Sequence, residues 1–223
     1  MKRVLVIGGN GRTGRHIVQK LRQFGDSVRV LTRQVKEAQT TTVEFIAGDI
    51  THWQDVEAAV RDVDGVVIIV ESAESDDAPN SPEQVHDQGT RNVLAAVGSN
   101  SVQIVLVTQI YITRPERYPE VSNIIHWRQQ AEEAVRASGL PYTIMRPGWL
   151  TDDSGDQGIR FEQGDRGEGQ VARETVAEVC VQALHQPTAQ SKTFEIYNEA
   201  GTPPTDWSEV FAALHSDSVF QMS

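Results

Sequence analysis

The sequence predicts a single α/β domain built on a doubly wound parallel sheet, with a small C-terminal extension. Short apolar runs bounded by Gly or Asp alternate with longer segments of helical period, which is the pattern of repeated β-α units. The chain has 223 residues, enough to bury one large core, and sheets of this class often reach that length as one domain. We therefore expect residues 1–223 to form one domain.

Seven segments have the composition of buried strands. Most of them are rich in β-branched residues and almost wholly apolar, as strands covered on both faces should be. Because helical segments separate them, we expect most of them to pair in parallel. The expected strands are residues 4–7, 28–31, 43–46, 66–70, 102–107, 142–145 and 193–197.

The first helix is indicated by apolar residues at helical spacing, followed by Gly25 where a left-handed C-cap is expected. Two further helix starts have the spacing of a capping box. The first pairs Thr51 with Gln54, and the second pairs Ser81 with Gln84, with a proline after the serine. The apolar residues of the first helix are Ile17, Val18, Leu21 and Phe24, and later helices are expected at residues 124–138, 173–185 and 206–214.

Residues 151–169 interrupt this regular pattern. The segment is rich in Gly, Asp and Gln, and it follows the strand expected at residues 142–145. Such composition is typical of loops. We expect it to be a mobile loop or a small subdomain over the functional site, and not a second domain.

Composition excludes several functions. The formal net charge is −11, which argues against a nucleic-acid partner because phosphate binding needs a basic face. The single cysteine, Cys180, lies among apolar residues, so we expect a buried thiol and neither a disulfide nor a cysteine metal cluster. No histidine spacing beside the acidic runs indicates a metal site. No apolar run reaches the length of a membrane span or a signal sequence, so we expect a cytoplasmic protein.

The turn Gly8–Gly14, GGNGRTG, leaves the first expected strand and opens the first expected helix. It satisfies both G-x-G-x-x-G and G-x-x-G-x-x-G, and the next strand follows within about 30 residues, as in dinucleotide-binding Rossmann folds. Glycine permits a tight turn and a close backbone approach, while the helix N-terminus favours a phosphate. Its expected cofactor contacts are Gly8, Asn10, Gly11, Arg12, Thr13 and Gly14.

The end of the second expected strand predicts which dinucleotide binds. An NAD site usually has an acidic residue there to accept from the ribose 2′-hydroxyl. This chain instead has Leu31-Thr32-Arg33. Arg33 can pair with a 2′-phosphate, and Arg12 is a second candidate for that phosphate. We therefore expect NADP(H) to be preferred over NAD(H).

Taken together, these residues resemble the short-chain dehydrogenase/reductase superfamily, in its atypical, NmrA-like branch, which also contains the biliverdin and flavin reductases. The resemblance covers nearly the whole chain. Besides the glycine turn, it depends on residues 48–50 (GDI), 89–93 (GTRNV) and 138–148 (SGLPYTIMRPG).

The resemblance implies further cofactor contacts. Asp49 and Ile50 would lie along the adenine, and Val70 and Glu71 would border the ribose and the phosphates. At the nicotinamide, the resemblance implies Thr108, Pro147, Gly148 and Trp149.

The chain departs from the family at its usual proton donor. Typical members use a Tyr-x-x-x-Lys pair, in which the lysine lowers the pKa of the tyrosine. Arg128 aligns with that lysine and Ile124 with the tyrosine, and Thr108-Gln109 stands at the position of the family serine. An arginine keeps the positive charge but not the tunable pKa of a lysine.

Four residues remain as candidates for catalysis because they follow the fifth expected strand or lie on the next helix: Tyr111, Gln109, Arg128 and His126. Tyr111 is the first candidate for a proton donor or a substrate contact, and the alternative is a packed loop aromatic. His126 is either an acid or a surface residue. Trp149 either forms an aromatic wall with Tyr111 or covers the core.

Two functions follow. The first is an NADPH-dependent reductase whose acceptor is a conjugated, quinoid or flavin-like small molecule that takes hydride without a tyrosine-lysine pair. The alternative is a non-catalytic NADP(H)-sensing regulator, with residues 113–121 and 151–169 as surfaces for a protein partner. A third option, an isomerase or epimerase that uses a bound cofactor transiently, has no sequence feature of its own.

Overall fold

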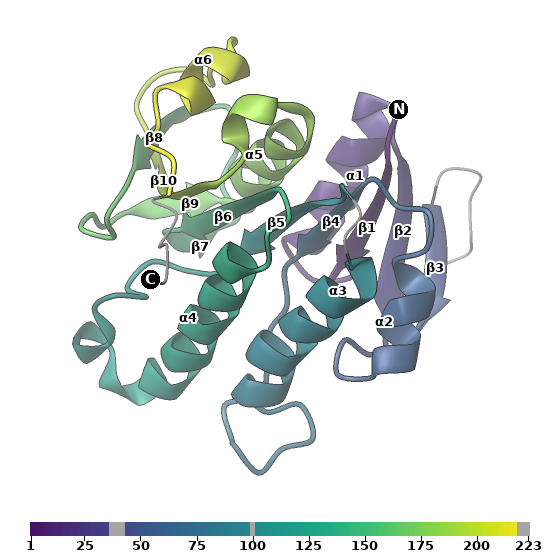
Figure 1. Cartoon of the computed structure of the whole chain (residues 1–223). Coiled ribbons are helices and arrows are strands. Elements are labelled where there is room, and N and C mark those ends of the chain that lie inside the picture. Colours follow the sequence, from purple (N-terminus) through teal and green to yellow (C-terminus); the bar gives the residue numbers. More distant parts are fainter. Residues whose placement is uncertain (36–42, 99–100, 218–223) are drawn as a thin grey trace.

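The main sheet is mostly parallel in the computed structural model, which describes residues 1–35, 43–98 and 101–217. Its strands are β1 (Arg3–Ile7), β2 (Ser27–Thr32), β3 (Val43–Ala47), β4 (Gly65–Ile68), β5 (Gln103–Val107), β6 (Tyr142–Pro147), β8 (Gly158–Glu162) and β10 (Lys192–Glu199). Their order is β3-β2-β1-β4-β5-β6-β10-β8, and only β8 runs antiparallel to its neighbour (Figure 1). The doubly wound α/β fold expected from the sequence is confirmed.

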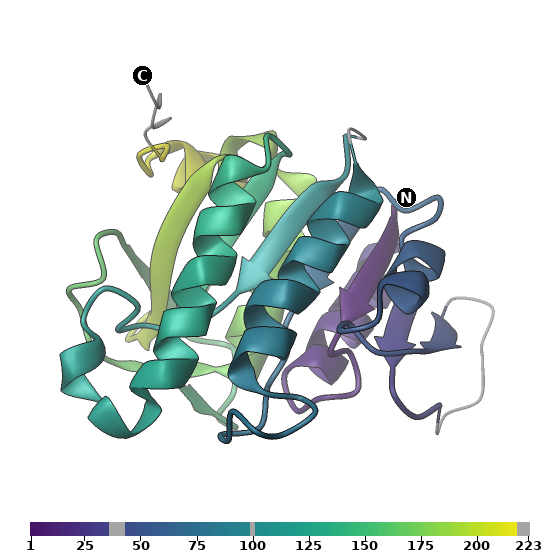
Figure 2. The same cartoon turned by 60° about the horizontal axis from the view of Figure 1, so that its bottom comes forward.

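Helices cover both faces of this sheet. They are α1 (Gly14–Phe24), α2 (Trp53–Ala59), α3 (Gly89–Val97), α4 (Ser122–Ala137), α5 (Arg173–His185) and α6 (Trp207–Ala212), with the short turns η1 (Glu83–Gln88), η2 (Pro115–Arg117), η3 (Pro119–Val121) and η4 (Pro187–Ala189). Figure 2 shows α2, α3 and α4 side by side on one face. On the other face α1 packs beside α5.

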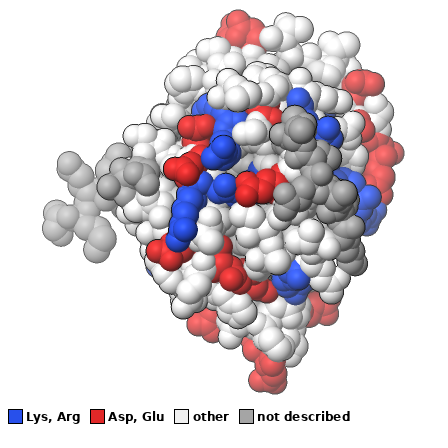
Figure 3. Space-filling model, turned by 90° about the vertical axis from the view of Figure 1, so that its right-hand side faces the viewer, with Lys and Arg blue, Asp and Glu red and all other residues white. Residues whose placement is uncertain are grey.

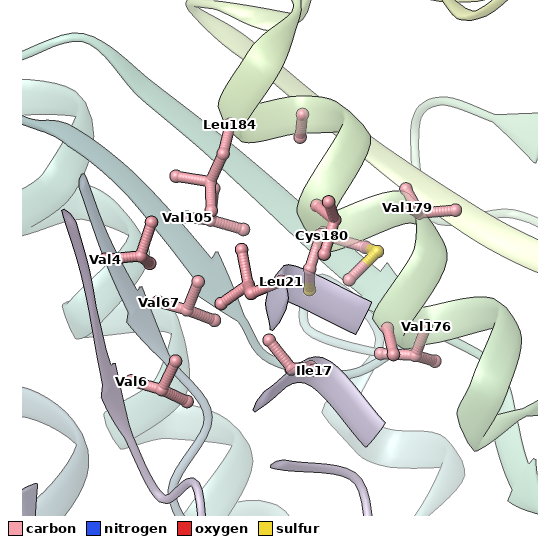
Figure 4. Packing of buried hydrophobic residues seen from close by; sticks show 14 of the residues in the cluster. Val4, Val6, Ile17, Leu21, Val67, Val105, Val176, Val179, Cys180 and Leu184 are labelled. Carbon is pink, nitrogen blue, oxygen red and sulfur yellow. The ribbon is translucent and has the colours of Figure 1, made fainter. Parts of the chain in front are cut away.

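Alternate residues of each strand enter opposite core layers, because neighbouring side chains of a strand point to opposite faces. In β1, Val4 and Val6 pack in the layer of α1 and α5, while Leu5 and Ile7 pack in the layer of α2, α3 and α4. Figure 4 shows the first layer, where the fully buried Cys180 of α5 lies close to the side chains of α1. Burial raises the pKa of Cys180, which confirms an apolar structural thiol.

The helix ends confirm some of the expected caps and contradict one. Gly25 ends α1 with φ 94°, the expected left-handed cap. The amide of Gln84 donates to Ser81 Oγ at 3.4 Å, although the segment then begins with the π-helical η1 and continues into α3. The box at Thr51 is wrong. The amide and the hydroxyl of Thr51 both donate to Asp49 Oδ1 at 2.9 Å, and α2 begins only at Trp53, without a side-chain cap.

The segment expected to be a loop over residues 151–169 contains the edge strand β8. This strand pairs with β10, and Phe161 packs against Phe194 with 5.5 Å between the ring centroids. Next to it, β7 (Trp149–Thr151) and β9 (Gln170–Ala172) form a separate two-stranded parallel sheet. The alternation of Ile159 and Phe161 with Arg160 and Glu162 is a strand pattern, but it is short and lies within a segment whose Gly, Asp and Gln content indicated a loop.

The negative charge of the chain is not spread evenly over the surface. On the face that lies to the right in Figure 1, basic side chains gather in the middle and acidic side chains lie beside them (Figure 3).

Within the described residues, no helix combines the length and the hydropathy that crossing a membrane would require.

Candidate active site

A cleft with two lobes lies at the carboxyl edge of the sheet, where the strand order reverses between β1 and β4. Open α/β sheets bind ligands at this switch point. The β2 lobe, about 370 Å³, extends toward Leu31, Thr32 and Arg33. The β6 lobe, about 290 Å³, extends toward Thr108, Pro147 and Leu150. The residues common to both lobes are Gly8, Gly11, Ile69, Val70 and Glu71.

The glycine turn between the lobes admits no side chain at two of its positions. Gly8 has φ 92°, and a Cβ on it would lie 1.8 Å from the carbonyl oxygen of Ile69. A Cβ on Gly14 would lie 2.1 Å from the carbonyl oxygen of Gly8. The amide of Gly11 closes the turn on that same Gly8 oxygen at 3.0 Å. Helix α1 then begins without a side-chain cap or an acidic residue in its first turn, which leaves its positive end open toward the cleft.

The β2 lobe contains most of the residues expected near the adenosine end of a dinucleotide. Asn10 Nδ2 donates to Thr32 Oγ1 at 2.9 Å, which links the glycine turn to the end of β2. Arg33 is exposed on the rim. Asp49 is held by Thr51 and by its own amide, which donates to Asp55 Oδ2 at 2.9 Å. Ile50 lines the lobe beside it.

Arg12 lies in the other lobe. Its guanidinium forms an ion pair with Asp152, whose second oxygen accepts from Arg173 Nη1 at 2.8 Å. The structure therefore does not bring Arg12 and Arg33 together, although the sequence analysis considered both for one phosphate. Asp152 and Arg173 were not among the expected site residues, because their pairing joins segments that are far apart in the chain.

Arg128 occupies the position of the family lysine beside the cleft, although neither it nor Gln109 is among the residues that line the two lobes. Its side chain is one-tenth exposed and donates from Nη2 to Glu71 Oε2 at 2.6 Å. Nη1 donates to Gln109 Oε1. These contacts tie α4 to the ends of β4 and β5. Ile124, one turn earlier, has no proton to give. The tyrosine and the lysine of the usual pair are therefore both replaced, by Ile124 and Arg128.

His86 was not expected from the sequence, yet it lies beside Arg128. The imidazole is buried on η1, and its Nε2 has no hydrogen-bond partner in the described part of the chain. Burial, followed by the charge of Arg128, lowers the pKa of His86 to about 2. The imidazole is therefore neutral and gives no proton at physiological pH.

Tyr111 is buried outside both lobes. Its backbone has φ 70°, and its amide donates to the fully buried Asp165 at 2.7 Å. The phenol oxygen finds no hydrogen-bond partner among residues 1–35, 43–98 and 101–217. Burial raises the pKa of Tyr111, and the neighbouring Tyr118 hydroxyl raises it further. These properties describe a packed aromatic better than a proton donor.

Trp149 and His126 also lie outside both lobes. Trp149 is half exposed and packs on Tyr118 with 5.2 Å between the ring centroids, while the next residue of β7, Leu150, lines the β6 lobe. Successive strand residues point to opposite sides, so only one of the two can face the lobe. His126 is exposed and packs edge-on against Trp127 at 4.9 Å.

Thr108 and Pro147 line the β6 lobe, as expected, and Gly148 lies behind it. A Cβ on Gly148 would lie 2.5 Å from the carbonyl oxygen of Gly169, so this glycine permits the close approach of the β7 and β9 segments. Thr108 Oγ1 donates to Glu132 Oε1 at 2.7 Å beneath the floor of the lobe.

Glu132 is the centre of a buried ion-pair network. Its carboxylate accepts from Arg146 at 2.9 and 2.6 Å and from Arg136 at 2.8 Å, and Arg146 also donates to Glu195 at 3.1 Å. Burial opposes the ionisation of Glu132, but Arg146, then Arg136 and Thr108, outweigh it and lower the pKa of Glu132. The network joins the end of β5 to β6 and to the middle of β10 below the lobe.

Comparison with known proteins agrees with a nucleotide-binding role for the cleft. Residues 8–187 match the profile of a family described as NAD(P)H-binding. The chain belongs to the NAD(P)H-binding family. An uncharacterized chloroplastic protein of Arabidopsis thaliana is 33% identical over 95% of this chain and 75% of its own length. The sanguinarine reductase of Eschscholzia californica is 26% identical over 95% of each chain.

A solved structure shares the fold. It is a short-chain dehydrogenase/reductase of the wide type from Veillonella parvula, in complex with NADP, with a TM-score of 0.73 and 20% identity over 92% of this chain and 99% of that one. This similarity confirms the Rossmann-type fold, and the match of residues 8–187 confirms the NAD(P)H-binding family that the motifs indicated.

Proposed function

We propose that the protein is an NADPH-dependent reductase of a conjugated, quinoid or flavin-like small molecule. The observation that carries this proposal is the setting of Arg128: a buried arginine held by Glu71 and Gln109 stands where a lysine would serve a tyrosine, and Ile124 replaces that tyrosine. Two of the similar proteins support the proposal by their names, since one is a reductase and the other was solved with NADP.

The cleft has the features that an elongated dinucleotide requires. Backbone amides of the glycine turn and the open end of α1 would hold the diphosphate between the two lobes. Arg33 would bind the 2′-phosphate, with Asp49 and Ile50 along the adenine. Thr108 and Pro147 would border the nicotinamide in the β6 lobe. When bound there, NADPH supplies a hydride.

The side chains of the cleft favour acceptors that need no dedicated proton donor. Arg128 is paired with Glu71 and Gln109 beside the cleft, and a guanidinium is not a general acid, so Arg128 does not replace the missing tyrosine as a proton donor. An aldehyde would become a strongly basic alkoxide and would need a proton at once. A quinone or flavin delocalises the charge and can take its proton from water, so that orientation in the cleft supplies most of the catalysis.

The cofactor preference is tested at Arg33. We expect Arg33→Ala to weaken NADPH binding about 10- to 100-fold, because a charge-assisted hydrogen bond contributes about 1.5–3 kcal/mol, and to leave NADH binding unchanged. Calorimetric titration with both dinucleotides measures this. Arg61→Ala is the matched control, since Arg61 is exposed between α2 and β4, at the opposite edge of the sheet. Equal weakening of both dinucleotides would contradict the 2′-phosphate assignment.

The reaction is tested by following NADPH consumption with menadione, riboflavin and benzaldehyde. We expect turnover with the quinone or the flavin and none with the aldehyde. If NADPH binds tightly but no acceptor is reduced, the reductase proposal fails. That outcome would favour the alternative of a regulator that senses NADP(H), which a pull-down with NADPH-loaded protein would then examine.

A further inference from the structure

Asp152 bridges two arginines at the mouth of the β6 lobe. It forms an ion pair with Arg12, which precedes α1, and accepts from Arg173, the first residue of α5, at 2.8 Å. Both arginines line the lobe. The Asp152 side chain is 62% exposed, and it lies just after β7. The exposed Asp152 carboxylate is thus paired with two guanidinium groups that line the β6 lobe.

Arg173 can donate more hydrogen bonds to an anion than it donates to Asp152. Its side chain is only 11% exposed, and its Nε is buried without a hydrogen-bond partner in the described residues. A guanidinium can bind a carboxylate or a phosphate through two parallel hydrogen bonds, whereas Arg173 makes one to Asp152. An unpaired buried N–H is costly, so a ligand that completes the pair would gain free energy.

The two arginines carry the positive charge of the lobe in a chain with a net charge of −11. The N-terminus of α5 also lies at the lobe, without a side-chain cap but with Glu174 in its first turn. Glu71 lines the lobe as well, and its carboxylate is paired with Arg128. The apolar part of the wall comes from Pro147, Leu150 and Val176.

We propose that Arg173 and Arg12 form a subsite for an anionic group of the substrate, a phosphate or a carboxylate, and that Asp152 holds this subsite until the substrate displaces it. The apolar walls then contact the body of the substrate. This inference rests on the proposed reductase function, because it places a substrate in the β6 lobe.

Asp152 can compete with an anionic substrate group for the two arginines. Desolvation opposes its ionisation, but Arg12 and then Arg173 outweigh this effect and hold the pKa of Asp152 below its usual range. The carboxylate is therefore charged at neutral pH. Its exposure allows it to leave without unpacking the core. An incoming phosphate carries more charge and three acceptor oxygens, so it competes well for the same two guanidinium groups.

The position of the arginines favours the substrate over the dinucleotide diphosphate as the source of the anion. Gly8 and Gly11 border both lobes, and Thr13 and Gly14 border the β6 lobe, so the diphosphate is expected along the glycine turn, where the lobes meet. Arg12 and Arg173 line the β6 lobe and not the β2 lobe. The two sources give opposite results in a competition experiment.

The test uses phenyl phosphate as the probe and phenol as its neutral match, in calorimetric titrations with and without saturating NADPH. We expect phenyl phosphate, but not phenol, to bind in both conditions. Arg173→Gln should weaken binding of phenyl phosphate by at least about tenfold, and Asp152→Asn should strengthen it by about tenfold. Asp153→Asn is the matched control, because it removes the same charge from the next, exposed residue.

Three results would overturn the subsite. NADPH could displace phenyl phosphate, which would assign the arginines to the cofactor. Asp152→Asn and Asp153→Asn could have equal effects, which would show only the loss of a negative charge. Phenyl phosphate could fail to bind at all. Because Asp152→Asn leaves the buried Arg173 in place, it keeps the test decisive if Arg173→Gln fails to fold.

The experiments distinguish failure of the subsite proposal from failure of the reductase proposal. A protein that consumes NADPH with menadione but ignores phenyl phosphate is a reductase without this subsite. A protein that binds phenyl phosphate under saturating NADPH but reduces no acceptor has the anion site and loses the reductase assignment.

Discussion

Gly8 illustrates how one residue determines the cleft. Its conformation, with φ 92°, points the backbone away from β1, and its missing side chain lets the turn touch the carbonyl of Ile69. Any other residue would meet two obstacles at once: a left-handed backbone and a direct clash. Because the clash is with backbone and not with a flexible side chain, nothing nearby can yield cheaply.

Gly25 has the left-handed backbone conformation of Gly8 without the steric clash, so it allows the two effects to be measured separately. It has nearly the same φ, 94°, but a Cβ there would meet no atom within 4 Å. We expect Gly25→Ala to lower the free energy of unfolding by about 1 kcal/mol, from backbone strain alone. Gly8→Ala should lower it by at least about 3 kcal/mol or abolish folding. Urea unfolding of both variants measures the difference, and equal losses would show that the contact with Ile69 relaxes freely.

Among the elements, α4 brings two different charged groups to the sheet. Arg128 and Glu132 are one turn apart, so they lie on the same face of the helix. The arginine pairs with Glu71, which lines both lobes of the cleft, while the glutamate is fully buried and pairs with Arg146. One helix therefore connects the chemistry of the cleft edge to the interior of the sheet.

Removing the charge of Glu132 tests this connection. We expect Glu132→Gln to lower the free energy of unfolding by about 3 kcal/mol, because it leaves Arg146 buried and only partly paired. Glu133→Gln, on the next and exposed residue, should change it by less than about 0.5 kcal/mol. Guanidinium unfolding of both variants provides the comparison. A small loss in Glu132→Gln would indicate that Glu195 alone satisfies Arg146.

The elements also show what can be predicted from sequence. Strands such as β1 and helix α5 were predicted because burial on both faces, or a regular helical period, leaves a local signal. The strand β8 was missed because its short alternation of apolar and charged residues lies in a segment rich in Gly, Asp and Gln, whose composition indicated a loop. The glycine turn and Arg33 were found through local spacing. His86, Glu132 and Arg173 were missed, because their roles arise from contacts between distant segments that no local pattern records.

At the scale of the whole molecule, the buried His86 makes stability depend on pH. The folded protein keeps this imidazole neutral, with a pKa of about 2, whereas the unfolded chain binds a proton below about pH 6.5. The unfolded state therefore holds more protons between these values, so stability falls as the pH falls below about 6.5. Carboxylates whose pKa is lowered on folding, such as Glu132, add to this loss only at more acidic pH.

The expected contribution of His86 is a slope of up to about 1.4 kcal/mol per pH unit in the free energy of unfolding. We expect His86→Gln to reduce the slope between pH 6 and pH 5 by most of that amount, as measured by urea unfolding at several pH values. His126→Gln is the control for replacing an imidazole at an exposed helix position. An unchanged slope in His86→Gln would mean that water reaches the imidazole and that it is protonated in the folded state.

The division of the cleft into two lobes also has a consequence for how the protein assembles during synthesis. The β2 lobe is lined only by residues up to Val85, whereas the β6 lobe needs Pro147, Arg173 and Val176. Because synthesis proceeds from the N-terminus, the first lobe can be complete while roughly half of the chain is still unmade. The lining of the β2 lobe therefore comes from the part of the chain that is made first, whereas the β6 lobe forms only when segments from both halves of the chain meet.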